Sequence, residues 1–153
     1  AERIREDKEE FRYELLNRDV RPGLGAARLG WFHLPLDLAK MREAAAHLLG
    51  EHDFSAFRSS ECQAKTPVRT LHALEIEARG ARIDFVLRAN AFLHHMVRNI
   101  VGTLIYVGKG RHPPAWAKEV LLSGRRSEAA PTFGPQGLYL EKIQYDPRWG
   151  LPQ

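Results

Sequence analysis

Residues 90–102 constrain the fold more than any other stretch, because their side chains separate with the period of a helix. Read in steps of four across residues 92–107, two neighbouring columns are apolar and two are polar, as an amphipathic helix requires. The polar half carries two imidazoles, the Arg98 guanidinium, an amide and Gly102, where a surface helix normally carries Glu and Lys. The pattern predicts a helix over residues 92–107 whose apolar half packs on a larger element.

Two interpretations of the polar half remain open. In the first, the polar half is the ordinary solvent-exposed face of a core helix, and its His and Arg side chains are solvated. In the other, Arg98 is held on a rigid element to form an ion pair or to bind phosphate, because a guanidinium grips a carboxylate or a phosphate at two points. Gly102, one turn further on, would let a backbone or a substrate come close.

Alternating patterns predict strands on both sides of this helix. Residues 82–90 place Ile83, Phe85 and Leu87 on one face, and together with residues 68–78 they predict a hairpin around Arg79-Gly80. Residues 11–15 and 138–145 predict a first and a last strand, and Arg21-Pro22-Gly23 breaks the first.

Two further helices have clear ends. Asp37 is placed to cap a helix over residues 38–48, which Gly50 ends, and Pro113-Pro114 opens another helix, which Gly124 stops. Asp53 caps a short turn that contains two phenylalanines. This mixture predicts an α+β fold, with a mostly antiparallel sheet, helices packed on one face, and the other face open for a ligand.

The bulk properties predict a single domain of 153 residues, with a charged lead-in over residues 1–10 and a tail over residues 147–153. No apolar run approaches the roughly 20 residues that cross a membrane. The net charge of +4 suits a polyanionic partner. A single cysteine, Cys62, excludes an internal disulfide and fits a reducing cytoplasm, and a small buried hydrophobe is the alternative to a catalytic thiol.

Five segments resemble the tRNA pseudouridine synthase A family, in the family's order and over nearly the whole chain. They are residues 12–22, 49–57, 66–69, 90–110 and 137–140. The resemblance implies an α+β domain whose sheet floor lines an RNA cleft, and an enzyme that isomerises uridines 38 to 40 in the anticodon arm of tRNA. It also implies a homodimer that needs no cofactor.

The catalytic aspartate of that family lies in an Arg-Thr-Asp-x-Gly-Val-His loop that this sequence lacks, since Arg69-Thr70 is followed by Leu71 in a strand pattern. In the family, the loop belongs to an N-terminal domain. The resemblance therefore implies that this chain is the C-terminal domain, inactive without the N-terminal catalytic domain. Arg98 aligns with the basic residue that pairs with the missing aspartate.

The resemblance also implies substrate-binding residues. Leu138 aligns with the apolar residue that packs against the target base. The alternative is that Leu138 is an ordinary core residue of a strand. Phe11 stands where the family has a stacking tyrosine, so the stacking face remains and the hydroxyl is lost, while Tyr13 on the same face could supply one. Phe133 is bulkier than the residue that the family usually has at this loop position. His94 would lie one helical turn before Arg98, on the same side of the helix, and help to form the floor of the cleft.

His94 and His95 predict no metal site, because neighbouring helical residues point about 100° apart.

Solvated surface charge is the alternative for every RNA-binding candidate. Lys109 and Arg111 are favoured for binding phosphates, because Gly108 and Gly110 allow the backbone to approach closely. The RNA-binding candidates are Arg58, Lys65, Arg69, Arg88, Lys109, Arg111, Arg125 and Arg126. Two rival functions are a stand-alone RNA-binding module and a dimerisation domain that uses the helix over residues 92–107.

Overall fold

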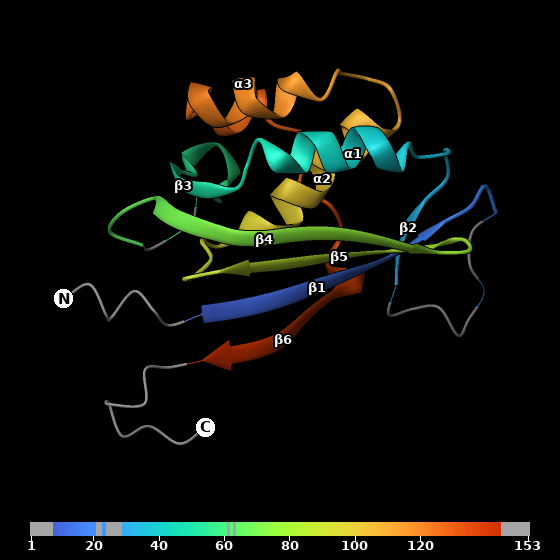
Figure 1. Cartoon of the computed structure of the whole chain (residues 1–153), viewed down its shortest axis with the longest axis horizontal. Coiled ribbons are helices and arrows are strands. Elements are labelled where there is room, and N and C mark those ends of the chain that lie inside the picture. The colour runs from blue at the N-terminus through green and yellow to red at the C-terminus, as the bar shows by residue number, and fades with distance from the viewer. Residues whose placement is uncertain (1–7, 21–22, 24–28, 61, 63, 145–153) are drawn as a thin grey trace.

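The computed structural model describes residues 8–20, 23, 29–60, 62 and 64–144. Most of the expected charged lead-in, the Arg21-Pro22 pair and the C-terminal residues 145–153 lie outside the described residues. Within them, six strands form one sheet, and three helices cover one of its faces (Figure 1). The expected α+β fold, with a mostly antiparallel sheet and helices on one side, is therefore confirmed.

The sheet is built around its first strand. Five strands follow the order β2-β1-β5-β4-β3, and β6 also pairs with β1. One edge of β1 pairs with β5. Its other edge pairs with β6 along the first half of β1 and with the parallel strand β2 along the last residues of β1. The other strand pairs are antiparallel. The strands are β1 Lys8–Asn17, β2 Gly30–Phe32, β3 Gly50–Asp53, β4 Val68–Arg79, β5 Arg82–Ala89 and β6 Leu138–Gln144.

The helices are α1 Leu38–Ala46, α2 Met96–Gly108 and α3 Ala115–Ser123. Two predicted ends are confirmed: the Asp37 side chain accepts a hydrogen bond from the Lys40 backbone N–H at 3.1 Å, and Gly124 ends α3 at a φ of 65°. The predicted end of α1 at Gly50 is wrong, because the helix already ends at Ala46 and Gly50 begins β3. The core lies between α2 and the sheet face that carries the buried alternating residues of β1 and β5. None of the helices among the described residues has the length and apolar character to cross a lipid bilayer.

Helix α2 departs from the prediction in two ways. It begins at Met96, four residues later than expected, because His95 has a left-handed backbone with a φ of 63° that an α-helix cannot continue through. Its polar half is also buried rather than wet, since Asn99 and Thr103 are 0% exposed. The interpretation of this half as an ordinary solvent-exposed face is therefore wrong, because residues 126–133 fold over it.

The sheet differs from the prediction at its edges. β1 begins at Lys8, inside the stretch expected to be a charged lead-in, and its first residues pair with β6. Strands β2 and β3, with three and four residues, were not predicted, because such short strands show too little alternation to be recognised.

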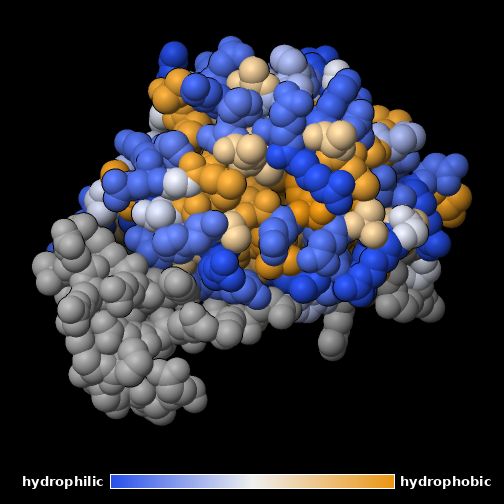
Figure 2. Space-filling view, in the orientation of Figure 1, coloured by the Kyte–Doolittle hydropathy of each residue, from blue (hydrophilic) through white to orange (hydrophobic). Residues whose placement is uncertain are grey.

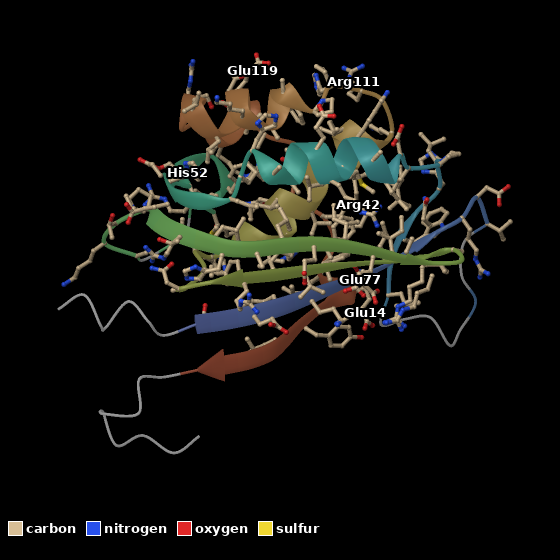
Figure 3. All side chains as sticks on the ribbon, in the orientation of Figure 1. Glu14, Arg42, His52, Glu77, Arg111 and Glu119 are labelled. Carbon is tan, nitrogen blue, oxygen red and sulfur yellow. The ribbon has the colours of Figure 1, made fainter. Side chains whose placement is uncertain are left out.

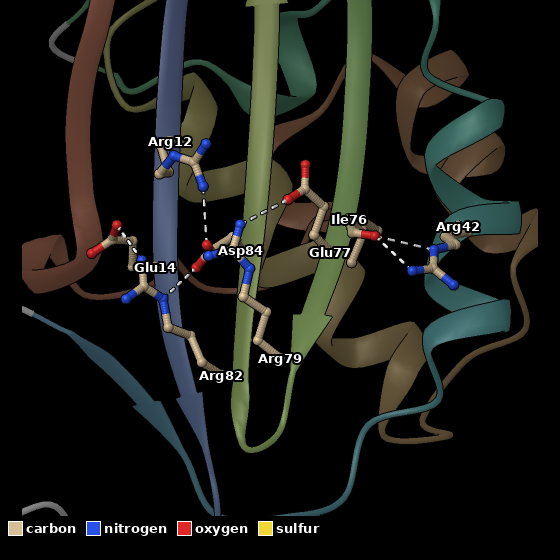
Figure 4. A network of polar contacts seen from close by, with 8 residues as sticks. All are labelled: Arg12, Glu14, Arg42, Ile76, Glu77, Arg79, Arg82 and Asp84. Carbon is tan, nitrogen blue, oxygen red and sulfur yellow. Dashed lines mark hydrogen bonds and ion pairs between the residues drawn. The ribbon is translucent and has the colours of Figure 1, made fainter.

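The sheet face opposite the helices is covered by paired charges (Figure 4). Asp84 is 1% exposed, and its two carboxylate oxygens accept hydrogen bonds at 2.9 Å from Arg12 and Arg82. Arg82 also contacts Glu14 at 2.6 Å. On the helical side, the Arg42 guanidinium reaches from α1 to the Ile76 carbonyl oxygen. Hydrophilic side chains surround an apolar region near this junction of α1 and β4 in Figure 2.

Candidate active site

Arg98 lies in the first turn of α2 and is half-buried. Its Nε donates a hydrogen bond to the Phe133 carbonyl oxygen at 2.8 Å, and the Phe133 backbone N–H approaches the Arg98 carbonyl oxygen at 3.4 Å. Among the described residues, the two terminal nitrogens of Arg98 have no hydrogen-bond partner. The bond at Nε therefore fixes the direction of the guanidinium and leaves two terminal donors for an anion.

The N-terminus of α2 adds to this positive potential. No side chain caps the helix, so its first-turn N–H groups have no side-chain acceptor among the described residues. The helix dipole and the Arg98 guanidinium both favour negative charge at this end. A carboxylate that meets Arg98 here would therefore be held in its ionised form.

Tyr13 forms the floor beneath Arg98. Its side chain is 0% exposed, its hydroxyl donates to the Gly134 carbonyl oxygen at 2.5 Å, and its ring meets the Phe133 ring edge-on at 5.7 Å. Burial raises the pKa of Tyr13, and the nearby positive charge of Arg98 opposes part of that rise. The hydroxyl expected to serve a substrate is thus buried and bonded within the fold, which corrects the role predicted for it.

The free energy of unfolding should fall as the pH rises above about 10, the ordinary pKa of tyrosine, because only the unfolded chain then ionises Tyr13 freely. The folded pKa is raised, so this contribution is complete below pH 10 and is lost at higher pH. Urea unfolding of the wild type and Tyr13→Phe from about pH 8 to 11 measures it. Tyr13→Phe should be less stable by about 1 kcal/mol at pH 8 and should show a shallower alkaline loss. An identical alkaline slope in the two proteins would contradict this assignment.

Two further predicted residues lie on the same side of the sheet. The register of β1 and β6 places Leu138 opposite Tyr13, and it places Phe11, two residues before Tyr13, on the same face of the sheet. Phe11 is half-buried, and its ring meets that of Phe92 edge-on at 5.3 Å. The structure therefore brings Arg98, Leu138 and Phe11 to one region, where β1 and β6 meet the start of α2.

Comparison with known proteins identifies the family of this chain. The sequence profile of a family described as tRNA pseudouridine synthase matches residues 44–146. The chain belongs to the tRNA pseudouridine synthase family. It is 63% identical over 143 residues to tRNA pseudouridine synthase A of Herminiimonas arsenicoxydans, covering 94% of this chain and 52% of that protein. The corresponding protein of Janthinobacterium sp. (strain Marseille) is 59% identical over 143 residues, with 94% and 53% covered. The chain thus spans about half the length of the curated relatives it matches, and the family resemblance read from its motifs is confirmed.

One predicted site residue of this tRNA pseudouridine synthase chain lies elsewhere than expected. His94 precedes α2 and is exposed, so it cannot share a helical column with Arg98. Its ring stacks on that of His95 at 4.0 Å between centroids, and its carbonyl oxygen accepts a hydrogen bond from Ser59. The argument that the two rings diverge was wrong, because it assumed helical geometry. Within the described part of the chain, no three His, Cys, Asp or Glu side chains are placed to hold a metal ion.

The basic residues expected to bind RNA do not form one patch. The Lys109 ammonium lies 4.2 Å from the Tyr106 ring centroid at the C-terminal end of α2, and the exposed Arg111 projects from the helical layer (Figure 3). Arg58 lies beside the other end of α2, roughly 20 Å away for a helix of this length. Arg69 bonds two backbone carbonyl oxygens of its own segment. Arg125 is exposed, and so are Lys65 and Arg88.

Arg126 is bonded within the fold, so it is not the ordinary solvated charge that was the alternative to its RNA-binding role. Its guanidinium donates to the Ala130 carbonyl oxygen at 2.9 Å, to Asn99 Oδ1 at 3.0 Å and to Thr132 Oγ1 at 2.9 Å. Asn99 also donates to the Phe57 carbonyl oxygen at 2.7 Å. This hub joins α2 to the turn Ser55–Phe57 and to the segment that follows α3. The sequence showed Asn99 on the polar half of the helix, but it did not show what would cover it.

Gly102 is confirmed as a point of close approach. A Cβ at this position would lie 2.6 Å from the Pro131 carbonyl oxygen, so only glycine lets residues 131–133 pack directly on the helix. Because Phe133 belongs to this covering segment, Gly102 also helps to hold the carbonyl oxygen that orients Arg98.

Proposed function

We propose that the chain is the C-terminal part of a tRNA pseudouridine synthase that converts uridine to pseudouridine in the anticodon arm of tRNA, at positions 38 to 40. The observation that carries the proposal is Arg98, a half-buried and oriented guanidinium whose terminal nitrogens find no acceptor among the described residues. An unpaired, partly desolvated cation is costly, so a partner anion is expected. The missing aspartate, supplied by the other half of the protein, is that anion.

In the proposed reaction, the bond between uracil N1 and ribose C1′ breaks, the base turns, and C1′ bonds to C5. The C5 proton then leaves to solvent and N1 takes up a proton, so no atom is gained or lost overall. Arg98 keeps the partner aspartate ionised and fixes its position, which is an electrostatic contribution made before the reaction starts. The open N-terminus of α2 acts in the same direction.

Phe11 and Leu138 are the proposed contacts to the target base. Both lie on the helix-facing side of the sheet, near the end of the strands where Arg98 projects. Phe11 offers a ring face for stacking but no hydroxyl, and the Tyr13 hydroxyl is already bonded to Gly134. Base recognition at this chain therefore depends on stacking and apolar packing, and proton transfer falls to groups outside it.

The chain alone should form no pseudouridine, because Arg98 orients a carboxylate but cannot replace one. Transfer RNA labelled with tritium at uridine C5 releases tritium to water only when C5 forms the new bond, so released tritium measures the reaction. We expect release with the full-length parent protein and none with the 153-residue chain. Replacing uridines 38 to 40 of the tRNA should stop release by the parent. Release by the chain alone would overturn the proposed division of labour.

A further inference from the structure

A surface pocket lies beside the N-terminus of α2 and does not include Tyr13 among its lining residues. Its volume is about 570 Å³, and it lies among the turn Ser55–Phe57, the start of α2 and the segment that follows α3. The residues that line it are Ser55, Arg58, Ser59, Ser60, Cys62, His95, Gly124, Arg126 and Thr132. Two guanidinium groups and several hydroxyl groups therefore face one hollow, and none of its described lining residues is acidic.

No described carboxylate forms an ion pair with either guanidinium of this pocket, although the charge of Arg58 contributes to lowering the pKa of Asp53. Arg126 bonds only to neutral oxygens of Asn99, Ala130 and Thr132, and burial lowers its pKa. The Arg58 guanidinium is half-buried and has no hydrogen-bond partner in the described part of the chain. Two partly desolvated cations with neutral partners favour an anion between them.

The backbone at the rim is strained. His95 is the only non-glycine residue with a positive φ among the described residues, and such conformations persist where the surroundings fix them. The same residue begins α2, so the pocket and Arg98 are held by one turn of chain. Thr132 lines the pocket, while the neighbouring Phe133 carbonyl oxygen orients Arg98. An occupant of the pocket would thus be fixed relative to the candidate active site.

We infer that this pocket binds one backbone phosphate of the RNA substrate, with its adjoining ribose, through Arg58 and Arg126. The inference rests on the proposed function and adds a contact outside the base-binding region. The volume exceeds the needs of a small anion and falls within the range of pockets that hold an organic ligand. The serine hydroxyls suit the ribose 2′-hydroxyl, which can both donate and accept.

Binding of unmodified tRNA to the chain over a series of salt concentrations tests the inference. Arg58→Ala should weaken binding about tenfold near physiological salt, as expected for one charge-assisted hydrogen bond. It should also reduce the slope of log affinity against log salt by about one. Arg58→Lys should restore the slope because it keeps the charge. Arg79→Ala is the matched control: this arginine lies at the end of the β4–β5 hairpin with a side chain 72% exposed, so affinity and slope should not change.

Three other results would overturn the inference. Wild-type and Arg58→Ala slopes that agree would exclude the phosphate contact while leaving the proposed reaction intact, since tritium release by the parent reports that reaction separately. Arg58-dependent binding of inorganic phosphate without an effect on tRNA would indicate a small-anion site instead. Failure of the wild-type chain to bind tRNA would remove the contact altogether. Thermal unfolding of Arg58→Ala should match the wild type, because its guanidinium bonds no described residue.

Discussion

Asn99→Ala is expected to lower the free energy of unfolding by about 3–5 kcal/mol, the largest stability effect of any substitution considered. Asn99 is 0% exposed and uses both ends of its amide, donating to the Phe57 carbonyl oxygen and accepting from Arg126 and Thr132. Alanine would leave the Phe57 carbonyl oxygen without a partner and would remove one of the three acceptors of the Arg126 guanidinium. A domain of this kind is stable by only about 5–15 kcal/mol, so the variant should show a much lower urea midpoint.

Thr103→Val is the matched control on the same helix. Thr103 is also 0% exposed, but its hydroxyl has no hydrogen-bond partner, so the fold gains nothing from it. Valine keeps the branched shape and removes the unpaired hydroxyl, which should leave stability unchanged or raise it by up to about 1 kcal/mol. Equal losses in the two variants would show that α2 tolerates no change here. The separate contribution of the Asn99 hub would then be refuted.

Arg98→Ala in the full-length parent should reduce turnover by about 100- to 1000-fold, comparable to the loss of one group that stabilises charge in a transition state. Affinity for tRNA should stay nearly unchanged, because Arg98 faces the proposed aspartate rather than a phosphate. The measurements are tritium release at saturating tRNA and a separate binding titration.

Arg98→Lys separates charge from geometry. Lysine keeps the positive charge but loses the planar fork and the fixed bond to Phe133, so turnover should recover only in part. A stand-alone RNA-binding module predicts a different result, in which neither variant changes the function of the parent. Normal turnover of Arg98→Ala would therefore reject the catalytic role of this residue.

The elements that sequence pattern predicted correctly are those with long, regular patterns. The β4–β5 hairpin shows clear alternation on β5, and α1 and α3 have recognisable caps at Asp37 and Gly124. The short strand β2 was missed because three residues carry no usable period, and its parallel pairing with β1 depends on tertiary contacts. Hydrophobic period also could not reveal the left-handed backbone of His95 that delays α2.

The candidate site was predicted in part, for a related reason. Arg98, Phe11 and Leu138 were identified from a family pattern, and the structure brings them to one region. The internal bonds of Arg126 could not be predicted, since a charge in a polar segment appears solvated until its partners are known. Those partners come from Asn99 and from residues 130–132, which lie apart in sequence. Polar character alone does not tell whether a side chain meets water or another side chain.

The pairing of β6 with β1 also bears on how the protein is made. Tyr13 and Gly134, which bond to each other beneath Arg98, lie 121 residues apart, so this region depends on contacts between early and late parts of the chain. During synthesis on a ribosome, the β4–β5 hairpin can form before β6 has emerged. Half of one edge of β1 stays unpaired until β6 is available to pair with it. Until then that edge exposes unpaired backbone groups, which are a template for wrong pairing with another chain. Strand β6 therefore both completes the face proposed to bind the base and covers an edge of β1 that would otherwise favour aggregation of the nascent protein.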